Sequence, residues 1–395
     1  PDLAVVNNGA GTVSVLLNTS AAGATSPTFA PQATFATGKA PVSVSIGDID
    51  GDGKPDLAVT NGLSNTVGVL LNTTAKGAAT PTFAPQAEFA TGASPWPVSI
   101  GDINGDGKPD LAVANNGAGT VSVLLNTTAA GATTPTFAPQ ATFATGKAPV
   151  SMAIGDVDGD GRPDLAVADY ASGSVSVLVN TTAAGAAAAS FAPRAAFATG
   201  EFPTSVALGD LNGDGRRDLA VSEYGSGSVS VLLNTTAAGA TTPSFLPRTA
   251  LAETDFPISV ALGDLNGDGR LDLAFADSTV EGSVSVLLNA TVGGALTASS
   301  ATGTTFEKPV GATMPLESIA VVAGPTSLQG NVTTTGAQSF AGNVVLTKSV
   351  VLEVTHGKDV TFGKAITSAV GLANALTVTT AGTTTLGGNV GGPLG

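Results

Sequence analysis

An acidic nine-residue loop recurs five times in this chain at a fixed spacing of 54 residues. Its first copy reads Asp48-Ile-Asp50-Gly-Asp52-Gly-Lys-Pro-Asp56, and the later copies begin at Asp102, Asp156, Asp210 and Asp264. A strict period of this length indicates a repeat architecture, in which each unit buries its apolar surface against its neighbours. The period therefore constrains the fold more than the length of 395 residues does.

One repeat contains four short β-rich runs and no helical pattern. In the copy around the second loop these runs are residues 98–100, 111–113, 120–125 and 137–145, and turn residues fill the gaps. Pro139 interrupts the last run, which suits an edge strand. Four strands in each repeat of this size are typical of a β-propeller blade.

The sequence therefore predicts an all-β chain with an antiparallel β-propeller over residues 1–323. Blocks begin at residues 2, 56, 110, 164, 218 and 272, which favours six blades over the alternative of seven. We expect residues 318–322 to form a last strand that joins the first three strands of the chain in one blade and closes the ring. A β-sandwich would not need so strict a period.

The loop has the composition of a calcium site. Calcium binds six to eight oxygen ligands, and glycine at positions 4 and 6 allows the chain to curl so that positions 1, 3 and 5 converge. We expect a carbonyl oxygen from position 7 and a carboxylate from position 9, and Asn at position 3 should weaken a site. The expected ligands of about five structural Ca²⁺ ions are Asp48, Asp50, Asp52, Lys54 and Asp56; Asp102, Asn104, Asp106, Lys108 and Asp110; Asp156, Asp158, Asp160, Arg162 and Asp164; Asp210, Asn212, Asp214, Arg216 and Asp218; and Asp264, Asn266, Asp268, Arg270 and Asp272.

Competing interpretations of the loop are weaker. An EF-hand needs Glu at position 12 and flanking helices, whereas position 12 of the first loop is Val59 within a predicted strand. Dockerin-type loops also lead into helices. A turn without metal would leave converging carboxylates to repel one another. A catalytic role is disfavoured, since the sites are nearly identical and the only histidine, His356, lies outside the repeats.

Composition limits the possible partners. The net charge is −15, and more than half of the 30 acidic residues lie in the five loops, so a nucleic-acid partner is disfavoured. There is no cysteine, which excludes disulfides and thiolate metal sites, and no apolar run is long enough to cross a membrane. Residues 1–5 match residues 55–59, so we expect a processed or partial form of a longer, secreted protein.

Residues 208–216 (Leu-Gly-Asp-Leu-Asn-Gly-Asp-Gly-Arg), followed by Asp218-Leu-Ala-Val, resemble the FG-GAP (VCBS-type) repeats known from integrin α-subunit propellers and bacterial extracellular proteins. The resemblance covers about 320 residues. It implies a calcium-stapled β-propeller, extracellular or at the cell surface, that serves adhesion or binding. Nothing precedes Asp2 in the first block, so no site is assigned there.

The face opposite the acidic loops is a candidate ligand face. In an up-and-down blade successive loops alternate between faces, which places the only Trp and both Tyr of the chain together with two Phe. Exposed aromatics of this kind are typical of carbohydrate or protein contacts, although they could also pack beneath their own loops. The residues are Trp96, Tyr170, Phe202, Tyr224 and Phe256.

Seven asparagines fit the N-glycosylation pattern, and most recur at one repeat position, so a turn role is favoured over glycan attachment. They are Asn18, Asn72, Asn126, Asn180, Asn234, Asn289 and Asn331.

Residues 324–395 form a tail rich in Thr, Val and Gly. Similar segments begin at residues 340, 362 and 386, a spacing that fits the coils of a parallel β-solenoid. Residues 333–340 resemble repeats of filamentous-haemagglutinin-like bacterial surface proteins. About three coils would leave unpaired strand edges, so the tail is expected to pair with another copy or to continue into a longer solenoid.

These observations favour a non-enzymatic extracellular module for adhesion or structure, which self-associates or contacts other surface proteins. A carbohydrate-binding propeller is the alternative, and a polysaccharide-cleaving enzyme is a third, disfavoured class because no singular acid–base cluster is present.

Overall fold

The computed structural model divides into two compact units, and each is described by itself. The first comprises Pro1–Gly263 and Leu273–Val286, and the second Asp264–Asp272 and Leu287–Gly395. The structure describes residues 2–253, 256–278, 282–289, 295–299, 304–306, 318–323, 325–329, 331–334, 337–347, 349–354, 358–369 and 375–390.

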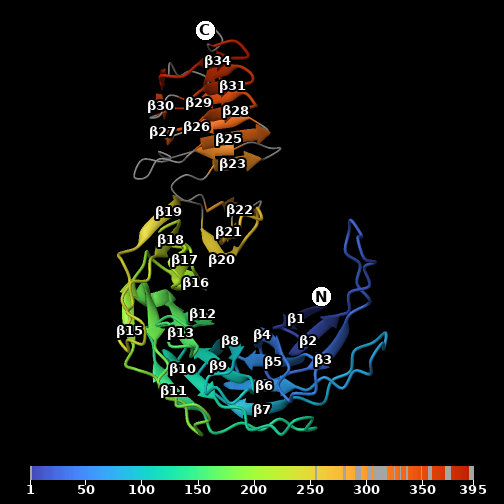
Figure 1. Cartoon of the computed structure of the whole chain (residues 1–395). Coiled ribbons are helices and arrows are strands. Elements are labelled where there is room, and N and C mark those ends of the chain that lie inside the picture. The colour runs from blue at the N-terminus through green and yellow to red at the C-terminus, as the bar shows by residue number, and fades with distance from the viewer. Residues whose placement is uncertain are drawn as a thin grey trace. The chain divides into compact units, whose positions relative to one another are not determined.

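The first unit consists of six antiparallel sheets, one for each repeat (Figure 1). In chain order they are β1-β2-β3, β4-β5-β6-β7, β8-β9-β10-β11, β12-β13-β14-β15, β16-β17-β18-β19 and β20-β21-β22. The strands are β1 (Leu3–Asn7), β2 (Thr12–Leu16), β3 (Ala33–Ala36), β4 (Pro41–Gly47), β5 (Asp56–Asn61), β6 (Thr66–Leu70), β7 (Ala87–Ala90), β8 (Pro95–Gly101), β9 (Asp110–Asn115), β10 (Thr120–Leu124), β11 (Ala141–Ala144), β12 (Pro149–Gly155), β13 (Asp164–Asp169), β14 (Ser174–Leu178), β15 (Ala195–Ala198), β16 (Pro203–Gly209), β17 (Asp218–Glu223), β18 (Ser228–Leu232), β19 (Thr249–Glu253), β20 (Pro257–Gly263), β21 (Asp272–Asp277) and β22 (Ser283–Leu287).

Each complete repeat folds into four strands, as the sequence predicts. In the third sheet β9 pairs with β10 in the register Leu111↔Leu124 and Val113↔Ser122, and Gly119 takes a positive φ of 63° in the turn between them. Every residue of β9 is buried, because sheets pack on both of its faces. The outer run is shorter than expected: β11 covers only Ala141–Ala144, and Phe137 forms an isolated bridge to Asn126.

Consecutive sheets pack face to face through one recurring interface. The side of a sheet turned toward the next carries two valines, such as Val121 and Val123, and these meet Leu165 and Val167 of the following sheet. An edge-to-face phenylalanine pair adds to each of the first four interfaces, with ring centroids 4.8–4.9 Å apart in every case. Figure 1 shows the six sheets following one another in an arc.

The predicted closure of the ring is wrong. Residues 318–322 do not pair with β1, because β25 (Ser318–Ala323) runs parallel to β23 (Ala295–Ser299) and β28 (Gln338–Phe340) in the second unit. Residues 304–306, expected within the sixth blade, likewise form β24, which is parallel to β26. The alternating pattern of β25 buries Ile319 and Val321 in the tail core, and no acidic loop follows to join it to a blade. The parallel sheets thus begin near residue 295 instead of 324.

The second unit contains three parallel sheets that resemble a β-solenoid, as expected for the tail. Their strand orders are β23-β25-β28-β31-β34, β24-β26-β29-β32 and β27-β30-β33. The remaining strands are β24 (Thr304–Phe306), β26 (Thr326–Leu328), β27 (Val332–Thr334), β29 (Val344–Leu346), β30 (Val350–Val354), β31 (Val360–Phe362), β32 (Ile366–Ser368), β33 (Leu376–Thr379) and β34 (Thr384–Leu386).

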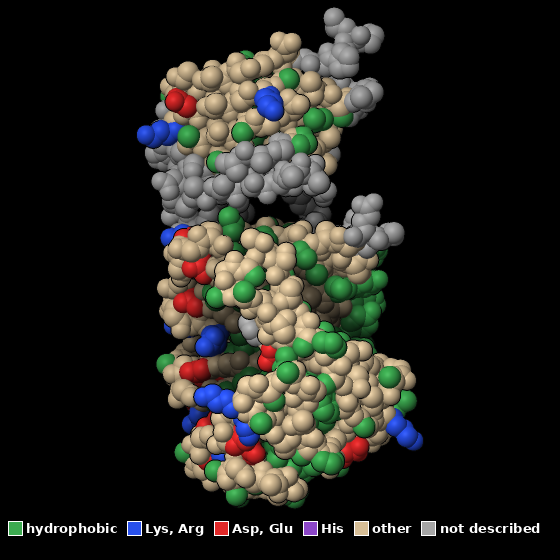
Figure 2. Space-filling view, turned by 90° about the vertical axis from the view of Figure 1, so that its right-hand side faces the viewer, with side chains coloured by type: hydrophobic (Ala, Val, Ile, Leu, Met, Phe, Trp, Pro, Cys, Tyr) green, Lys and Arg blue, Asp and Glu red, His purple; other side chains and the backbone are tan. Residues whose placement is uncertain are grey.

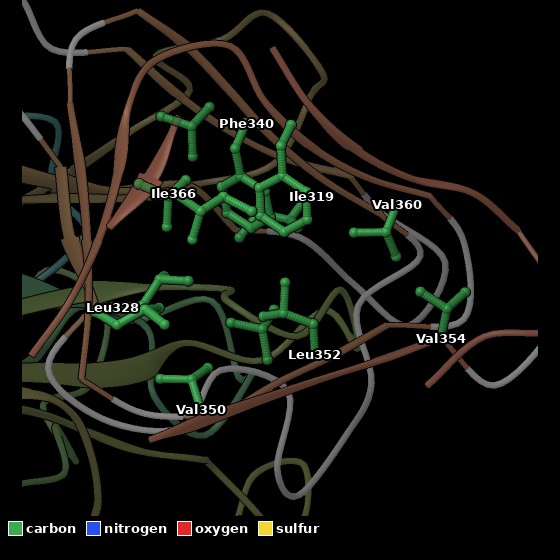
Figure 3. Close-up of a cluster of buried hydrophobic side chains, with 13 residues drawn as sticks. Ile319, Leu328, Phe340, Val350, Leu352, Val354, Val360 and Ile366 are labelled. Carbon is green, nitrogen blue, oxygen red and sulfur yellow. The ribbon is translucent and has the colours of Figure 1, made fainter. Parts of the chain in front are cut away.

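The core of the second unit is a stack of inward-pointing apolar side chains (Figure 3). Ile319, Phe340 and Val360 come from one sheet, and the rings of Phe340 and Phe362 stack with centroids 5.4 Å apart. Gln338 is also fully buried, where its Nε2 donates to the carbonyl oxygens of Val332 and Glu353. His356 lies outside the described residues.

Among the described residues, helical structure is confined to one 3-10 turn at Tyr170–Ser172, and none of them belongs to a helix able to cross a membrane.

Candidate metal centres

Each acidic loop joins the first strand of a sheet to the second, as β4 and β5 are joined by residues 48–55. Gly51 and Gly53 of the first loop have φ values of 69° and 84°, and the same two glycines are left-handed in all five loops. This backbone region is readily accessible only to glycine. The curl predicted from glycine at positions 4 and 6 is therefore confirmed.

Backbone N–H groups hold the carboxylates of the loop in place. Asp48 accepts hydrogen bonds from the N–H groups of Asp52 (3.0 Å) and Gly53 (2.9 Å). Asp56 accepts from Ile49 (2.8 Å) through one oxygen and from Asn72 (2.7 Å) through the other. The last aspartate thus ties the start of the loop to the far end of the next hairpin, and the other four loops repeat this bond pattern.

Two loops bring three carboxylates together. Oxygen atoms of Asp48, Asp50 and Asp56 lie within 4.8 Å of one another, and those of Asp156, Asp158 and Asp164 do the same. Like charges at this distance repel unless a cation or a proton intervenes. In the remaining loops position 3 is Asn104, Asn212 or Asn266, whose amide oxygen replaces one carboxylate.

Asp158 provides the structural test of whether these residues fit a metal ion. Its side chain is 2% exposed, and its Oδ2 has no hydrogen-bond partner, whereas its Oδ1 accepts from the N–H of Asp160. A buried, unpartnered carboxylate oxygen is costly, and a hard divalent cation would satisfy it. The donor set is all oxygen, so the cluster fits such an ion.

Burial raises the pKa of the closing aspartate in the first three loops. The pKa values of Asp56, Asp110 and Asp164 rise to about 6 because their carboxyl groups are removed from solvent, against the lowering effect of their backbone hydrogen bonds. Burial also raises the pKa of Asp158. These shifts report the cost of keeping negative charge at the base of each loop without a cation.

Positions 5 and 7 interact in a way that the sequence analysis missed. The Nζ of Lys54 lies 2.6 Å from a carboxylate oxygen of Asp52, and Arg216 lies 3.3 Å from Asp214. The hydrogen bond from Lys54 lowers the pKa of Asp52. Asp52 and Asp160 lie outside the two three-acid clusters. The basic residue at position 7, predicted only to supply a carbonyl, thus contacts the position-5 carboxylate with its side chain.

The acidic loop of one sheet is clamped by the next sheet. The Nδ2 of Asn126 donates to the carbonyl oxygens of Ile49 (2.8 Å) and Pro109 (3.0 Å), and the N–H of Gly131 donates to that of Asp50 (2.8 Å). Asn180 and Asn234 make the same bonds one and two repeats later. The acidic loops and the Asn-Thr-Thr connections therefore share one face.

This clamp also explains the recurring glycosylation pattern. The side chains of Asn126, Asn180 and Asn234 are at most 2% exposed, and each Nδ2 donates two hydrogen bonds. In the folded chain these amide nitrogens are not accessible for modification. The repeat position serves packing between sheets, which supports the turn interpretation.

On the opposite face the structure brings the candidate ligand residues together in pairs. The rings of Tyr170 and Phe202 stack with centroids 4.9 Å apart, and those of Tyr224 and Phe256 lie 5.1 Å apart. Phe202 and Phe256 have φ values of 53° and 58° and are about half exposed. Trp96 is 41% exposed and makes no aromatic pair among the described residues.

Comparison with known proteins identifies the repeat. The family model of the FG-GAP-like repeat matches residues 1–59, 102–167, 156–221 and 210–275, and that of the FG-GAP repeat matches residues 40–80. No curated protein matches the sequence.

Several solved structures are similar to this chain at low identity. A catalytically inactive virginiamycin B lyase from Staphylococcus aureus, solved with quinupristin, is 13% identical, with a TM-score of 0.44 over 73% of this chain and 77% of the other. The biofilm matrix protein Bap1 of V. cholerae is 16% identical, with a TM-score of 0.35 over 63% and 37%. At these values the likenesses say nothing about what this chain binds.

Proposed function

We propose, from the premise that this chain belongs to the FG-GAP repeat family, that it is a non-enzymatic, calcium-stabilised module of the cell exterior that serves structure or adhesion. The observation that carries the metal part is the unpartnered Oδ2 of Asp158 within a cluster of three carboxylates. The side chains at positions 1, 3, 5 and 9 and the carbonyl at position 7 would hold one ion in each loop. The family and the all-oxygen donor set support calcium.

The ion would act as a staple between sheets. Each of the first three loops is clamped by the next sheet through an asparagine, so ordering the loop also orders the sheet-to-sheet contact. Binding to the folded chain alone stabilises it by mass action. The near-identity of the five loops supports a structural role, because a catalytic site is normally singular.

Calcium titration of the metal-free chain tests this proposal. Isothermal titration calorimetry should show about one Ca²⁺ bound per loop, with Mg²⁺ binding more weakly because its octahedral shell tolerates crowded carboxylates poorly. Replacement of Asp156, Asp158 and Asp164 together by Asn should remove one equivalent. Absence of calcium binding at millimolar concentration would contradict the proposal.

Self-association and surface contacts form the second part of the proposal. The last strand of the tail, β34, pairs on one side only within the described residues, and Leu386 and Val390 are 51% and 59% exposed. An open edge of a parallel sheet can add a strand from another chain. We therefore propose the tail as one site of contact between copies.

Carbohydrate binding on the aromatic face is the alternative function. The observation that favours it is that Phe202 and Phe256 are large aromatic residues in a left-handed backbone conformation. The equivalent residues in earlier repeats have the same left-handed conformation but smaller side chains, and they are Ala40, Ser94 and Ala148. Strained backbone held at an exposed aromatic is a signature of binding sites. A glycan array probed with the chain and with its Tyr170→Ala and Tyr224→Ala variants tests it, and equal binding by all three would contradict it.

A further inference from the structure

Neighbouring acidic loops are joined to each other through one asparagine. The Nδ2 of Asn126 donates to the carbonyl oxygen of Ile49 in the first loop (2.8 Å) and to that of Pro109 in the second loop (3.0 Å). Its backbone N–H donates to Asp110 (2.7 Å), which is the closing aspartate of the second loop. Asn126 therefore contacts two candidate metal sites at once, and the clamp on one loop is anchored to the next loop.

The same link recurs between the second and third loops and between the third and fourth loops. In each case Nδ2 reaches the carbonyl oxygen at position 2 of one loop and that at position 8 of the next, and the backbone N–H reaches the carboxylate at position 9. All four loops belong to the first unit, and Figure 2 shows charged side chains of both signs gathered toward one edge of this unit. The two further links are Asn180 with Ile103, Pro163 and Asp164, and Asn234 with Val157, Arg217 and Asp218.

The closing aspartate carries each link on to the next. One oxygen of Asp110 accepts from Asn126, and the other accepts from the N–H of Ile103, whose carbonyl oxygen is held by the following asparagine. A path of hydrogen bonds, each 2.7–2.8 Å long, thus runs without interruption from Asp56 in the first loop to Asp218 in the fourth. Every residue on this path is at most 2% exposed, so water does not compete for its bonds.

Ordering one loop therefore orders part of its neighbour. Asp164 is an expected ligand at position 9 of the third loop, and its carboxylate holds the backbone N–H of Asn180, whose Nδ2 holds the carbonyl oxygen of Ile103 in the second loop. In the same connection the N–H of Gly185 holds the carbonyl oxygen of Asn104 (2.7 Å). The entropy cost of ordering this connection is shared by two sites, so a second ion meets a loop that is already ordered.

We propose that Asn126, Asn180 and Asn234 are positioning residues that couple the first four loops, so that calcium binding at one loop raises the affinity of the neighbouring loops. The coupling is reciprocal, because a change in binding free energy between two sites acts equally in both directions. This inference rests on the proposed calcium binding and adds cooperativity between the sites.

Nuclear magnetic resonance of a chain with isotope-labelled glycine tests the coupling, because the glycine at position 6 of each loop reports on that loop alone. Calcium is titrated into the metal-free chain while the amide signals of Gly107 and Gly161 are followed. In the wild-type chain the second and third loops should fill together, with a Hill coefficient above one. Emptying the third loop by Asp156→Asn and Asp158→Asn should raise the calcium concentration that half-fills the second loop by about fivefold or more.

Replacement of the linking asparagine should remove this dependence. Asn180→Ala keeps the backbone N–H that bonds Asp164 but has no Nδ2, so the second loop should bind calcium equally weakly whether the third loop is intact or emptied. Asn72→Ala is the matched control, since the described bonds of Asn72 reach only the first loop, at Pro55 and Asp56, and it should leave the coupling of the second and third loops intact. The comparison of the wild-type chain with the emptied third loop does not require Asn180→Ala to fold.

The outcomes separate the coupling from calcium binding itself. A second loop that is half-filled at the same calcium concentration with the third loop intact or emptied would overturn the coupling and leave calcium binding in place. A dependence that persists in Asn180→Ala would overturn the role of the asparagine. Glycine signals that do not move with calcium would contradict the proposed calcium binding, and the coupling with it.

Discussion

Strands β13 and β17 each carry a buried acidic residue at both ends, and the negative charges at the two ends are compensated differently. At one end Glu223 is fully buried and accepts hydrogen bonds from the backbone N–H of Gly200 (2.7 Å), the hydroxyl of Ser230 (2.9 Å) and the guanidinium of Arg248 (2.8 Å). At the other end Asp164 shares its cluster with Asp156 and Asp158, and one oxygen of Asp158 has no partner. Where the protein supplies its own cation the buried charge is balanced within the fold, whereas a metal ion could satisfy the unpartnered oxygen at the loop end.

The charge of the cluster around Glu223 differs from that of the equivalent clusters in some other sheets. In the third sheet the equivalent cluster is neutral, with Asn115 donating to Ser122 and Ser122 donating to Gln140. In the fourth sheet Asp169 lies 3.7 Å from Arg194, and the pKa of Asp169 is raised by burial against the lowering effect of Ser176 and Arg194. Acid and base therefore occur together in the fourth and fifth sheets, so that buried charge is balanced within the sheet.

Calcium removal should lower thermal stability more than any other change, because it acts on all five acidic loops at once. At a calcium concentration 100 times the dissociation constant each site contributes about 2.7 kcal/mol, and the combined loss should lower the melting temperature by more than about 10 °C. Scanning calorimetry with calcium and with EDTA measures this. Identical melting curves would show that the loop ends hold no ion.

Breaking the protein's own ion pair should be the next largest effect and should not depend on calcium. Arg248→Ala leaves Glu223 buried without its cation and should lower the free energy of unfolding by roughly 2–4 kcal/mol, with and without EDTA. The double variant Glu223→Asn, Arg248→Gln reproduces the neutral cluster of the third sheet and should recover most of the loss. Denaturant unfolding measures both, and a double variant less stable than the single one would argue against charge balance.

The loop end was predictable from the sequence, and the opposite end was not. The glycines and aspartates of the loop lie close together in sequence, so their spacing predicts the curl and the approach of positions 1, 3 and 9, whereas position 5, which was expected to converge with positions 1 and 3, lies outside the clusters. Arg248 meets Glu223 only through strand pairing across 25 residues, although Gln140 and Arg248 stand at the same repeat position.

The propeller-like sheets were predictable from the 54-residue period, but the pairing partner of residues 318–322 was not. A short apolar run fits an antiparallel blade and a parallel coil equally well.

Removing the asparagine that clamps one acidic loop should lower the free energy of unfolding by less than calcium removal or Arg248→Ala does. Asn180→Ala deletes the two hydrogen bonds that Nδ2 donates to the carbonyl oxygens of Ile103 and Pro163, together with the one that Oδ1 accepts from the N–H of Thr182, and should lower the free energy of unfolding by about 1–2 kcal/mol. It should also weaken calcium binding at the loop that begins at Asp102. Asn72→Ala is the matched control, since the structure records one such bond, to Pro55, for its Nδ2. Equal losses in the two variants would mean that the contact between sheets adds nothing.

The smallest effect, with a sign that depends on calcium, is expected for Asp158→Asn, which copies the residue found in the second, fourth and fifth loops. With calcium the variant should be less stable by about 1 kcal/mol, because the site loses one carboxylate. With EDTA it should be more stable at neutral pH, because burial raises the pKa of Asp158 and the folded state then carries a costly charge.

The pH dependence in EDTA follows from the same raised pKa. The carboxyl group of Asp158 keeps its proton to higher pH in the folded state than in the unfolded state, so the wild-type chain should lose stability relative to the variant as the pH rises above about 4. Thermal unfolding of both chains across pH 4–8 measures the difference, and a variant that is destabilised equally with and without calcium would show that Asp158 acts through packing instead of through the ion.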